Sequence, residues 1–150
     1  MSDLFIQCIC AFMATISFSL LFGVPVRYYP WCGFIGGAGW IFYLLAKPAT
    51  STPVATFIAT VGVILMSRFF AVRKRCPVTI FLIAGIFPLV PGAGIYWSAF
   101  YMVSNELATA ASTGFEALKS VIAIVLAIVF VFELPQKLFC PPKNQKTTRF

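Results

Sequence analysis

The residues best suited to chemistry lie in the middle of a hydrophobic stretch, residues 77–103, where two prolines and two glycines interrupt it. Each proline removes a backbone donor and clashes with the preceding turn, so we expect the helix to break here. A half-helix that begins after Pro91 and Gly92 would aim its unpaired amides at an anion, and Tyr96 would lie about one turn further on. The pattern predicts a binding site for a carboxylate or an ion, made by Pro88, Pro91, Gly92, Gly94 and Tyr96. The alternative is a kink that only shapes the helix bundle, with Tyr96 as a packing or interfacial aromatic.

The composition indicates an integral membrane protein. Of the 150 residues, 61% are hydrophobic and 10% are charged, and the mean hydropathy is +0.96. Soluble domains are about a quarter charged, and a chain of this length has too small a core to hide so many apolar side chains. In a bilayer, broken backbone is tolerated only inside the protein or beside a water-filled cavity, and many transporters build substrate sites from such broken helices.

Five hydrophobic segments approach the length of about 20 residues that a transmembrane helix needs. We therefore predict an all-α, polytopic membrane bundle with about five transmembrane helices, of which the fourth is broken by proline and glycine. A re-entrant hairpin in place of the fourth span ranks lower. The bundle is expected over residues 1–135, with a polar loop over residues 104–114 and a basic cytoplasmic tail over residues 136–150. The expected spans are 4–24, 31–46, 54–72, 77–103 and 115–134.

The basic residues are divided unequally between the two sides of this arrangement. The net charge is +7, and the charges lie between hydrophobic segments and near the C-terminus, which does not indicate nucleic-acid binding. Cytoplasmic loops retain Lys and Arg, so we expect the N-terminus outside and the C-terminus in the cytoplasm. The inner side would hold Arg27, Arg68, Arg73, Lys74, Arg75, Lys137, Lys143, Lys146 and Arg149, and the outer side Lys47 and Lys119.

A group of small residues lies in the second expected span, at Gly33, Gly36 and Gly37. Gly33 and Gly37 have the spacing that lets two membrane helices approach closely. Helix packing is therefore the expected role of these glycines, and a place in the wall of a transport pathway is the alternative.

The chain offers no catalytic or metal-binding constellation. It has no histidine, so neither a Ser-His-Asp nor a Cys-His arrangement can form within it. Cys8 and Cys10 lie in an apolar run without a second pair of ligands, which makes a zinc site improbable. We expect no enzymatic activity, no metal and no cofactor.

Polar side chains within the spans are expected to find local partners. Hydroxyl groups in membrane helices usually donate to their own backbone, although a hydrophilic path is the alternative for Thr56, Thr60 and Ser67. Arg68 is close enough to the end of its span to extend toward the surface. Glu116 and Lys119, three residues apart, are expected to pair at the outer surface.

Three parts of the sequence together resemble the threonine/serine exporter family, and more closely the small subunit of its split bacterial form. They are the run from Phe22 to Arg27, the glycine-rich second span and the element Pro-x-x-Pro-Gly-x-x-x-Tyr from Pro88 to Tyr96, which is the most specific. The similarity covers roughly residues 4–135. The resemblance implies a subunit in the bacterial inner membrane that exports threonine and serine, or succinate, together with a larger membrane subunit.

Two functions remain open at this stage. The chain is either a transporting subunit that binds a small-molecule substrate, or a non-transporting scaffold that stabilises the larger partner through its glycine face. Whether two copies also form a homo-oligomer in the lipid bilayer is left open.

Overall fold

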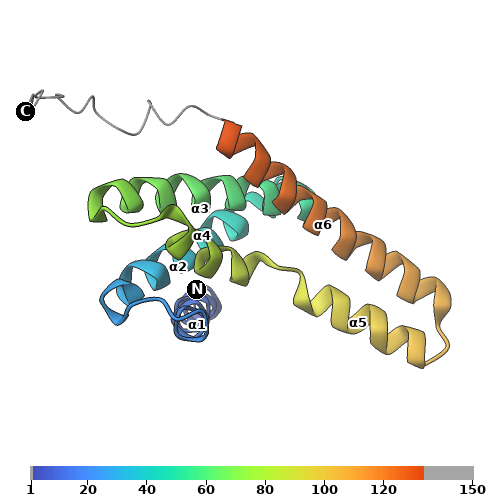
Figure 1. Cartoon of the computed structure of the whole chain (residues 1–150). Coiled ribbons are helices and arrows are strands. Elements are labelled where there is room, and N and C mark those ends of the chain that lie inside the picture. Colours follow the sequence, from blue (N-terminus) through green and yellow to red (C-terminus); the bar gives the residue numbers. More distant parts are fainter. Residues whose placement is uncertain (1, 134–150) are drawn as a thin grey trace, which may run out of the picture.

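The structure is a computed structural model and describes residues 2–133 (Figure 1). This part of the chain is helical and contains no strand, which confirms the all-α prediction. The expected tail, residues 136–150, lies outside the described residues. The helices are α1 (Ser2–Leu21), η1 (Val26–Tyr28), α2 (Tyr29–Ala46), α3 (Thr52–Lys74), α4 (Val78–Ile86), η2 (Phe87–Leu89), α5 (Gly92–Val103) and α6 (Leu107–Glu133).

The first four α-helices form the packed centre of the molecule. Helix α2 lies between α1 and α3, and α4 packs against both α2 and α3. Small residues allow these close approaches, because a Cβ added at Gly85 of α4 would lie 2.9 Å from Cγ2 of Ile35 and 3.0 Å from Cγ1 of Val63. Ile35, Val63 and Phe81 are fully buried at this junction.

Helices α5 and α6 form a hairpin that extends away from this centre, at the right of Figure 1. Helix α5 buries no residue and packs against α6. Ser98 Oγ of α5 donates a hydrogen bond of 2.9 Å to the Ala110 carbonyl of α6. Helix α6 also packs along α3. The hairpin is therefore held to the molecule by α6 and by the break that joins α4 to α5.

Two of the described helices, α3 and α6, are long and apolar enough to cross a membrane. The pair Val78–Leu89 and Gly92–Val103, bent by 45°, adds a third if it forms one span, and Phe5–Leu21 of α1 is a shorter apolar segment. By length and composition this makes two or three spans, so the expected number of five is not confirmed.

The loop expected over residues 104–114 is helical from Leu107 onward. The turn consists of Ser104–Glu106, with Asn105 in the left-handed conformation (φ 63°) that asparagine tolerates better than most residues. Polar residues after the turn did not prevent helix formation, because Thr113 Oγ1 donates to the Thr109 carbonyl one turn earlier, at 2.8 Å. Such a bond gives the hydroxyl a partner within the helix, so a polar side chain at this position does not require a loop.

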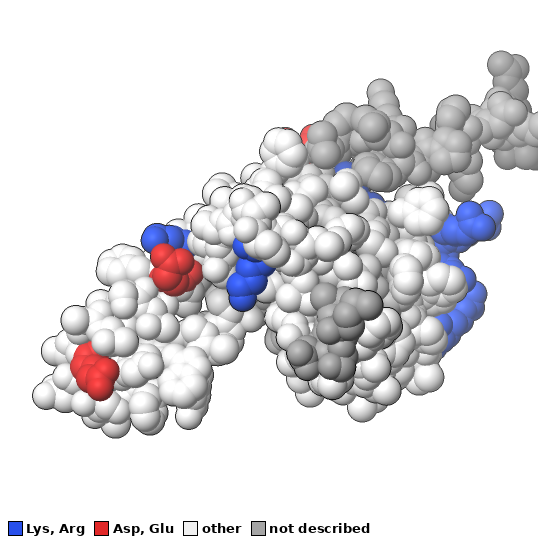
Figure 2. All heavy atoms as spheres, turned by 180° about the vertical axis from the view of Figure 1, so that it is seen from behind, with Lys and Arg blue, Asp and Glu red and all other residues white. Residues whose placement is uncertain are grey.

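The basic residues next to α2, α3 and α4 gather at one end of the molecule, and Figure 2 shows a dense group of Lys and Arg at its right edge. The Lys74 ammonium lies 4.3 Å from the centre of the Trp31 ring, which places the end of α3 beside the start of α2. Arg68 is buried rather than extended to the surface, and its guanidinium donates to the Phe132 carbonyl at 3.4 Å. The last turn of α6 therefore lies at the same end, and the side of the membrane that this end faces stays a prediction.

Candidate functional site

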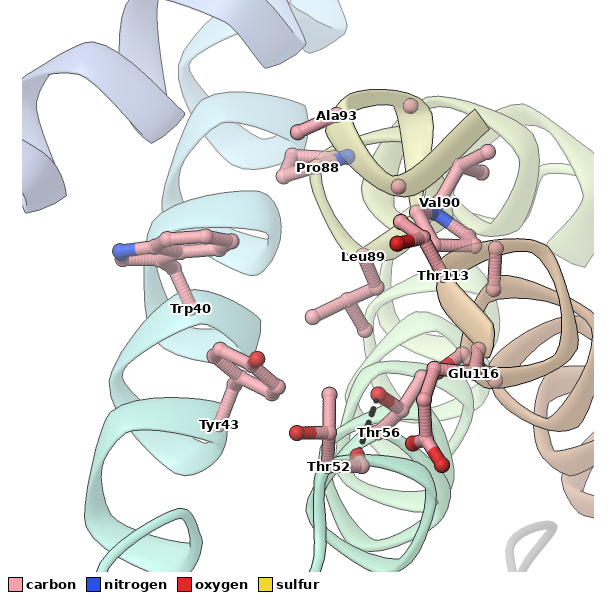
Figure 3. A pocket seen from close by; sticks show the side chains of 15 residues that line it. Trp40, Tyr43, Thr52, Thr56, Pro88, Leu89, Val90, Ala93, Thr113 and Glu116 are labelled. Atoms are coloured by element: carbon pink, nitrogen blue, oxygen red, sulfur yellow. Dashed lines mark hydrogen bonds between the residues drawn. The ribbon is translucent and has the colours of Figure 1, made fainter. Parts of the chain in front are cut away.

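A cavity of about 330 Å³ lies where the break between α4 and α5 meets helices α2, α3 and α6 (Figure 3). This volume is at the lower end of the range of about 300–1,000 Å³ that is typical of ligand pockets. The break lines it from Pro88 to Gly94 without interruption. The other lining residues are Trp40, Tyr43, Thr52, Thr56, Thr113, Glu116, Ala117 and Ser120.

The backbone of the break follows from its two prolines. Helix α4 ends at Ile86 and continues as the short helix η2, after which Val90 is extended (φ −64°, ψ 129°). Extended backbone is what a residue before proline prefers. Helix α5 then begins at Gly92, directly after Pro91, as the sequence predicts. The two halves meet at 45°.

The first turn of α5 contributes Gly92, Ala93 and Gly94 to the cavity wall. Amides in the first turn of a helix have no partner within the helix, and no side chain caps this one. The Gly92 amide donates to the Val90 carbonyl at 2.7 Å, but the amides of Ala93 and Gly94 have no backbone acceptor among the described residues. Because the helix dipole adds a partial positive charge here, this wall of the cavity favours an anion.

The two glycines of the break have different surroundings. A Cβ added at Gly94 would lie 3.1 Å from Cβ of Ala117, so this glycine allows α5 to approach α6 closely. A Cβ at Gly92 would meet no atom within 4 Å, so a larger residue fits there without a clash. Gly92 is therefore a residue of the cavity wall at which a side chain can be added with little effect on folding.

Hydroxyl groups line the walls that α3 and α6 contribute. Thr56 Oγ1 donates to the Thr52 carbonyl at 2.9 Å, and Ser120 Oγ donates to the Glu116 carbonyl at 3.1 Å. Thr60 and Ser67 also donate to the carbonyls four residues earlier, which confirms the predicted local bonding of all three hydroxyls in the third span. Since their protons are engaged, Thr56 and Ser120 can offer the cavity only oxygen lone pairs.

Glu116 is the single charged side chain among the described residues that line the cavity. Its carboxylate accepts a hydrogen bond of 2.8 Å from Lys119, the pair that the sequence predicts, and both side chains are more than half exposed. In Figure 3 Glu116 lies on the side of Thr56, across from Trp40 and Tyr43. The cavity thus combines a negative side chain with a positive helix terminus.

The structure brings four of the five predicted binding residues into one wall: Pro88, Pro91, Gly92 and Gly94. Tyr96 does not line the cavity. Its side chain is 62% exposed and its ring packs against that of Trp97, with 5.4 Å between the centroids. A contact between Tyr96 and a substrate therefore stays a prediction that this arrangement does not support.

Sequence reasoning missed the contributions of α2 and α6. Thr113 is helical rather than part of a loop, because α6 begins eight residues before the expected start at residue 115. Glu116, expected only as a partner of Lys119 at the outer surface, also lines the cavity. The available signal was the spacing of Thr113, Glu116 and Ser120, which puts them on one face of a helix. No pattern in the sequence pointed to Trp40 or Tyr43.

The three glycines of α2 face α1 of the same chain. A Cβ added at Gly33 would lie 2.8 Å from a ring carbon of Phe12, and one at Gly36 would lie 2.8 Å from both Cβ and Cγ2 of Thr15. At Gly37 the nearest atom is Cβ of Phe12, at 3.8 Å. All three glycines are buried, so within the described structure this face is already occupied.

The described residues contain no group of three or more His, Cys, Asp or Glu that could hold a metal ion.

A family model described as "Threonine/Serine exporter, ThrE" matches residues 7–133, a range that includes every residue of the cavity wall. No curated protein and no solved structure matches the chain.

Proposed function

The chain belongs to the threonine/serine exporter family, and from this membership we propose that it is the membrane subunit of a secondary transporter that exports small carboxylate-bearing metabolites. Threonine and serine, or succinate, are the candidate solutes. The subunit acts with a larger membrane subunit of the same family in the inner membrane of a bacterial cell. Its N-terminus lies outside and its C-terminus lies in the cytoplasm.

The observation that carries this proposal is the cavity at the broken span. Its wall includes Ala93 and Gly94 of the first turn of α5, whose amides lack backbone acceptors among the described residues. All candidate solutes contain a carboxylate, and a helix N-terminus is a ready binding site for that group. Discontinuous helices that bind substrates in this way are common in secondary transporters.

The role of a larger partner is supported by the α5–α6 hairpin. Helix α5 buries no residue, and large apolar side chains are exposed along it, among them Trp97, Phe100 and Val103. A second subunit packed against this exposed apolar hairpin would cover it and complete the wall of a pathway. The proposed arrangement counts α1, α2, α3, the α4–α5 pair and α6 as five spans.

The alternative is a scaffold that does not transport and holds the partner through its glycine face. This alternative has less support because Gly33 and Gly36 already pack against α1 within the chain. A scaffold role also does not explain why the cavity wall contains Ala93 and Gly94, whose amides lack backbone acceptors among the described residues.

Export from intact cells loaded with threonine, serine or succinate tests the proposed function. Cells would express this chain alone, the larger subunit alone, or both. We expect export only when both are present. If the larger subunit alone exports as much as the two subunits together, this chain does not transport the solute and is at most a scaffold.

The variant Gly92→Leu tests whether the cavity is the binding site. Leucine at this position meets no neighbour at its Cβ and adds bulk to the cavity wall, so the protein should fold but lose most of its export. Ala99→Leu is the matched control, because Ala99 is an exposed residue of the same helix that does not line the cavity. Normal export by Gly92→Leu would show that the substrate passes elsewhere.

A further inference from the structure

The face of α6 that lines the cavity carries a set of oxygen acceptors around one negative charge. Thr113, Glu116 and Ser120 follow the spacing that keeps side chains on one side of a helix, and all three line the cavity. Thr56 of α3 belongs to the same wall. Thr56 and Ser120 are 3% and 2% exposed, and both hydroxyl protons are donated to backbone carbonyls. This wall therefore suits a cationic donor.

The ion pair between Glu116 and Lys119 leaves the carboxylate free to change partners. The two residues are three apart on one helix and both side chains are more than half exposed, and such pairs contribute little stability in water. Lys119 itself lines a separate apolar groove, with Pro53 and Ile122, and not the cavity. A cation inside the cavity would thus compete with Lys119 for Glu116 at low cost.

The start of α5 differs in charge from the Glu116 wall, because the amides of Ala93 and Gly94 lack backbone acceptors and favour an anion. A solute with both charges would meet a partner for each of them. An ammonium group has three donors and no acceptor, so it suits a wall that offers the Glu116 carboxylate and further oxygen acceptors. A dicarboxylate would satisfy only the amides and would bring its second negative charge into a cavity that already contains Glu116.

We propose that Glu116 is a specificity-determining residue that binds the ammonium group of the substrate, so that the cavity selects zwitterionic amino acids over dicarboxylates. This inference rests on the proposed function, because it assigns the solute of the same transporter. It assigns the selection of threonine and serine over succinate to one residue of the cavity wall.

The test compares serine with glycerate, which matches it in shape but lacks its positive charge, and with the dicarboxylate succinate. The complex with the larger subunit is reconstituted into vesicles, and KM is measured for serine, for glycerate, in which a hydroxyl replaces the ammonium, and for succinate. A charge-assisted hydrogen bond corresponds to about a tenfold or greater change in affinity. In the wild type we expect KM for serine to be at least about tenfold lower than KM for glycerate. Equal values would overturn the inference without any variant.

The variant Glu116→Gln removes the charge and keeps the shape of the side chain. We expect it to raise KM for serine at least about tenfold and to leave KM for glycerate unchanged or lower. Glu106→Gln, in the α5–α6 turn and outside the cavity wall, is the control and should leave all values unchanged. Lys119→Gln frees Glu116 of its present partner and should leave KM for serine unchanged or lower.

The outcomes separate this inference from the proposed function. If the wild-type complex moves none of the three solutes, the proposed function fails and the inference fails with it. If the wild type moves serine and Glu116→Gln moves it with the same KM, the inference alone is wrong. A wild type that prefers succinate to serine would support an exporter and would overturn the role of Glu116.

Discussion

The contact between α1 and α2 can be tested at two neighbouring glycines that differ in the room around them. A Cβ at Gly36 would lie 2.8 Å from Cβ and from Cγ2 of Thr15 and would overlap Oγ1 of the same residue. Rotation of the Thr15 side chain can move Oγ1 and Cγ2 but cannot relieve the contact with Cβ of Thr15, because the backbone fixes that atom 2.8 Å from the added Cβ. The Gly36→Ala substitution therefore forces α1 and α2 apart.

The size of the effect follows from a comparison with Gly37→Ala. A Cβ at Gly37 would be 3.8 Å from Cβ of Phe12 and 3.9 Å from the Cys8 carbonyl oxygen, which are ordinary contacts. Both substitutions gain the same helix propensity, about 0.5–1 kcal/mol. That gain cancels in the comparison, and overpacking typically costs about 1–3 kcal/mol. We expect Gly36→Ala to have a free energy of unfolding about 1–3 kcal/mol lower than Gly37→Ala.

The assay is reversible unfolding in mixed detergent micelles, followed by the fluorescence of the three tryptophans. Gly33→Ala should fall between the two variants, because its Cβ would meet the far end of the Phe12 ring, which can move. Equal stability of Gly36→Ala and Gly37→Ala would refute the reasoning, since it would mean that α1 does not pack on α2 through Thr15.

Three further outcomes are expected. Arg68→Ala should lower the free energy of unfolding by about 1–3 kcal/mol, measured in the same micelles, because the Phe132 carbonyl loses a charged donor and the end of α6 loses a favourable cation; unchanged stability would contradict this. Gly114→Leu should separate α5 from α6, since even a Cβ would lie 2.9 Å from Ser98 Oγ, and faster proteolysis of the hairpin would report it, whereas wild-type resistance would not fit. In a variant whose other cysteines are alanine, maleimide should reach Cys76 from the cytoplasmic side only. Burial raises the pKa of the Cys76 thiol, against the lowering effects of Tyr28 and Arg27, so less thiolate is present at neutral pH. Labelling should therefore be slow at neutral pH and accelerate as the pH rises. Labelling from outside intact cells would reverse the proposed orientation.

Local rules were sufficient for several features of this protein. The fraction of hydrophobic residues indicates a membrane protein because no core of this size could hide them. Pro88 and Pro91 predict the break because the constraint on proline acts within its own turn, and α5 begins at Gly92 as expected. The hydroxyls of the third span donate to carbonyls four residues earlier, which is also a short-range event.

Other expectations depended on which residues would meet across the molecule, and these were incomplete. Tyr96 follows the break in the sequence, yet it lies outside the cavity wall. Arg68 is close to the end of its span, yet the last turn of α6 covers it. The polar residues before residue 115 indicate a loop by composition, but they are helical from Leu107 because α6 extends along α5.

The sequence by itself determined the class of protein, the position of the broken helix and the close-packing character of α2. Only the tertiary structure decided that the break faces α2, α3 and α6, that Glu116 lines the resulting cavity and that Gly36 is tighter than Gly37. The physical reason is the range of the forces. Dihedral preferences and hydrophobicity act on a residue and its neighbours, whereas a cavity is the space left between helices far apart in the sequence after their side chains have packed.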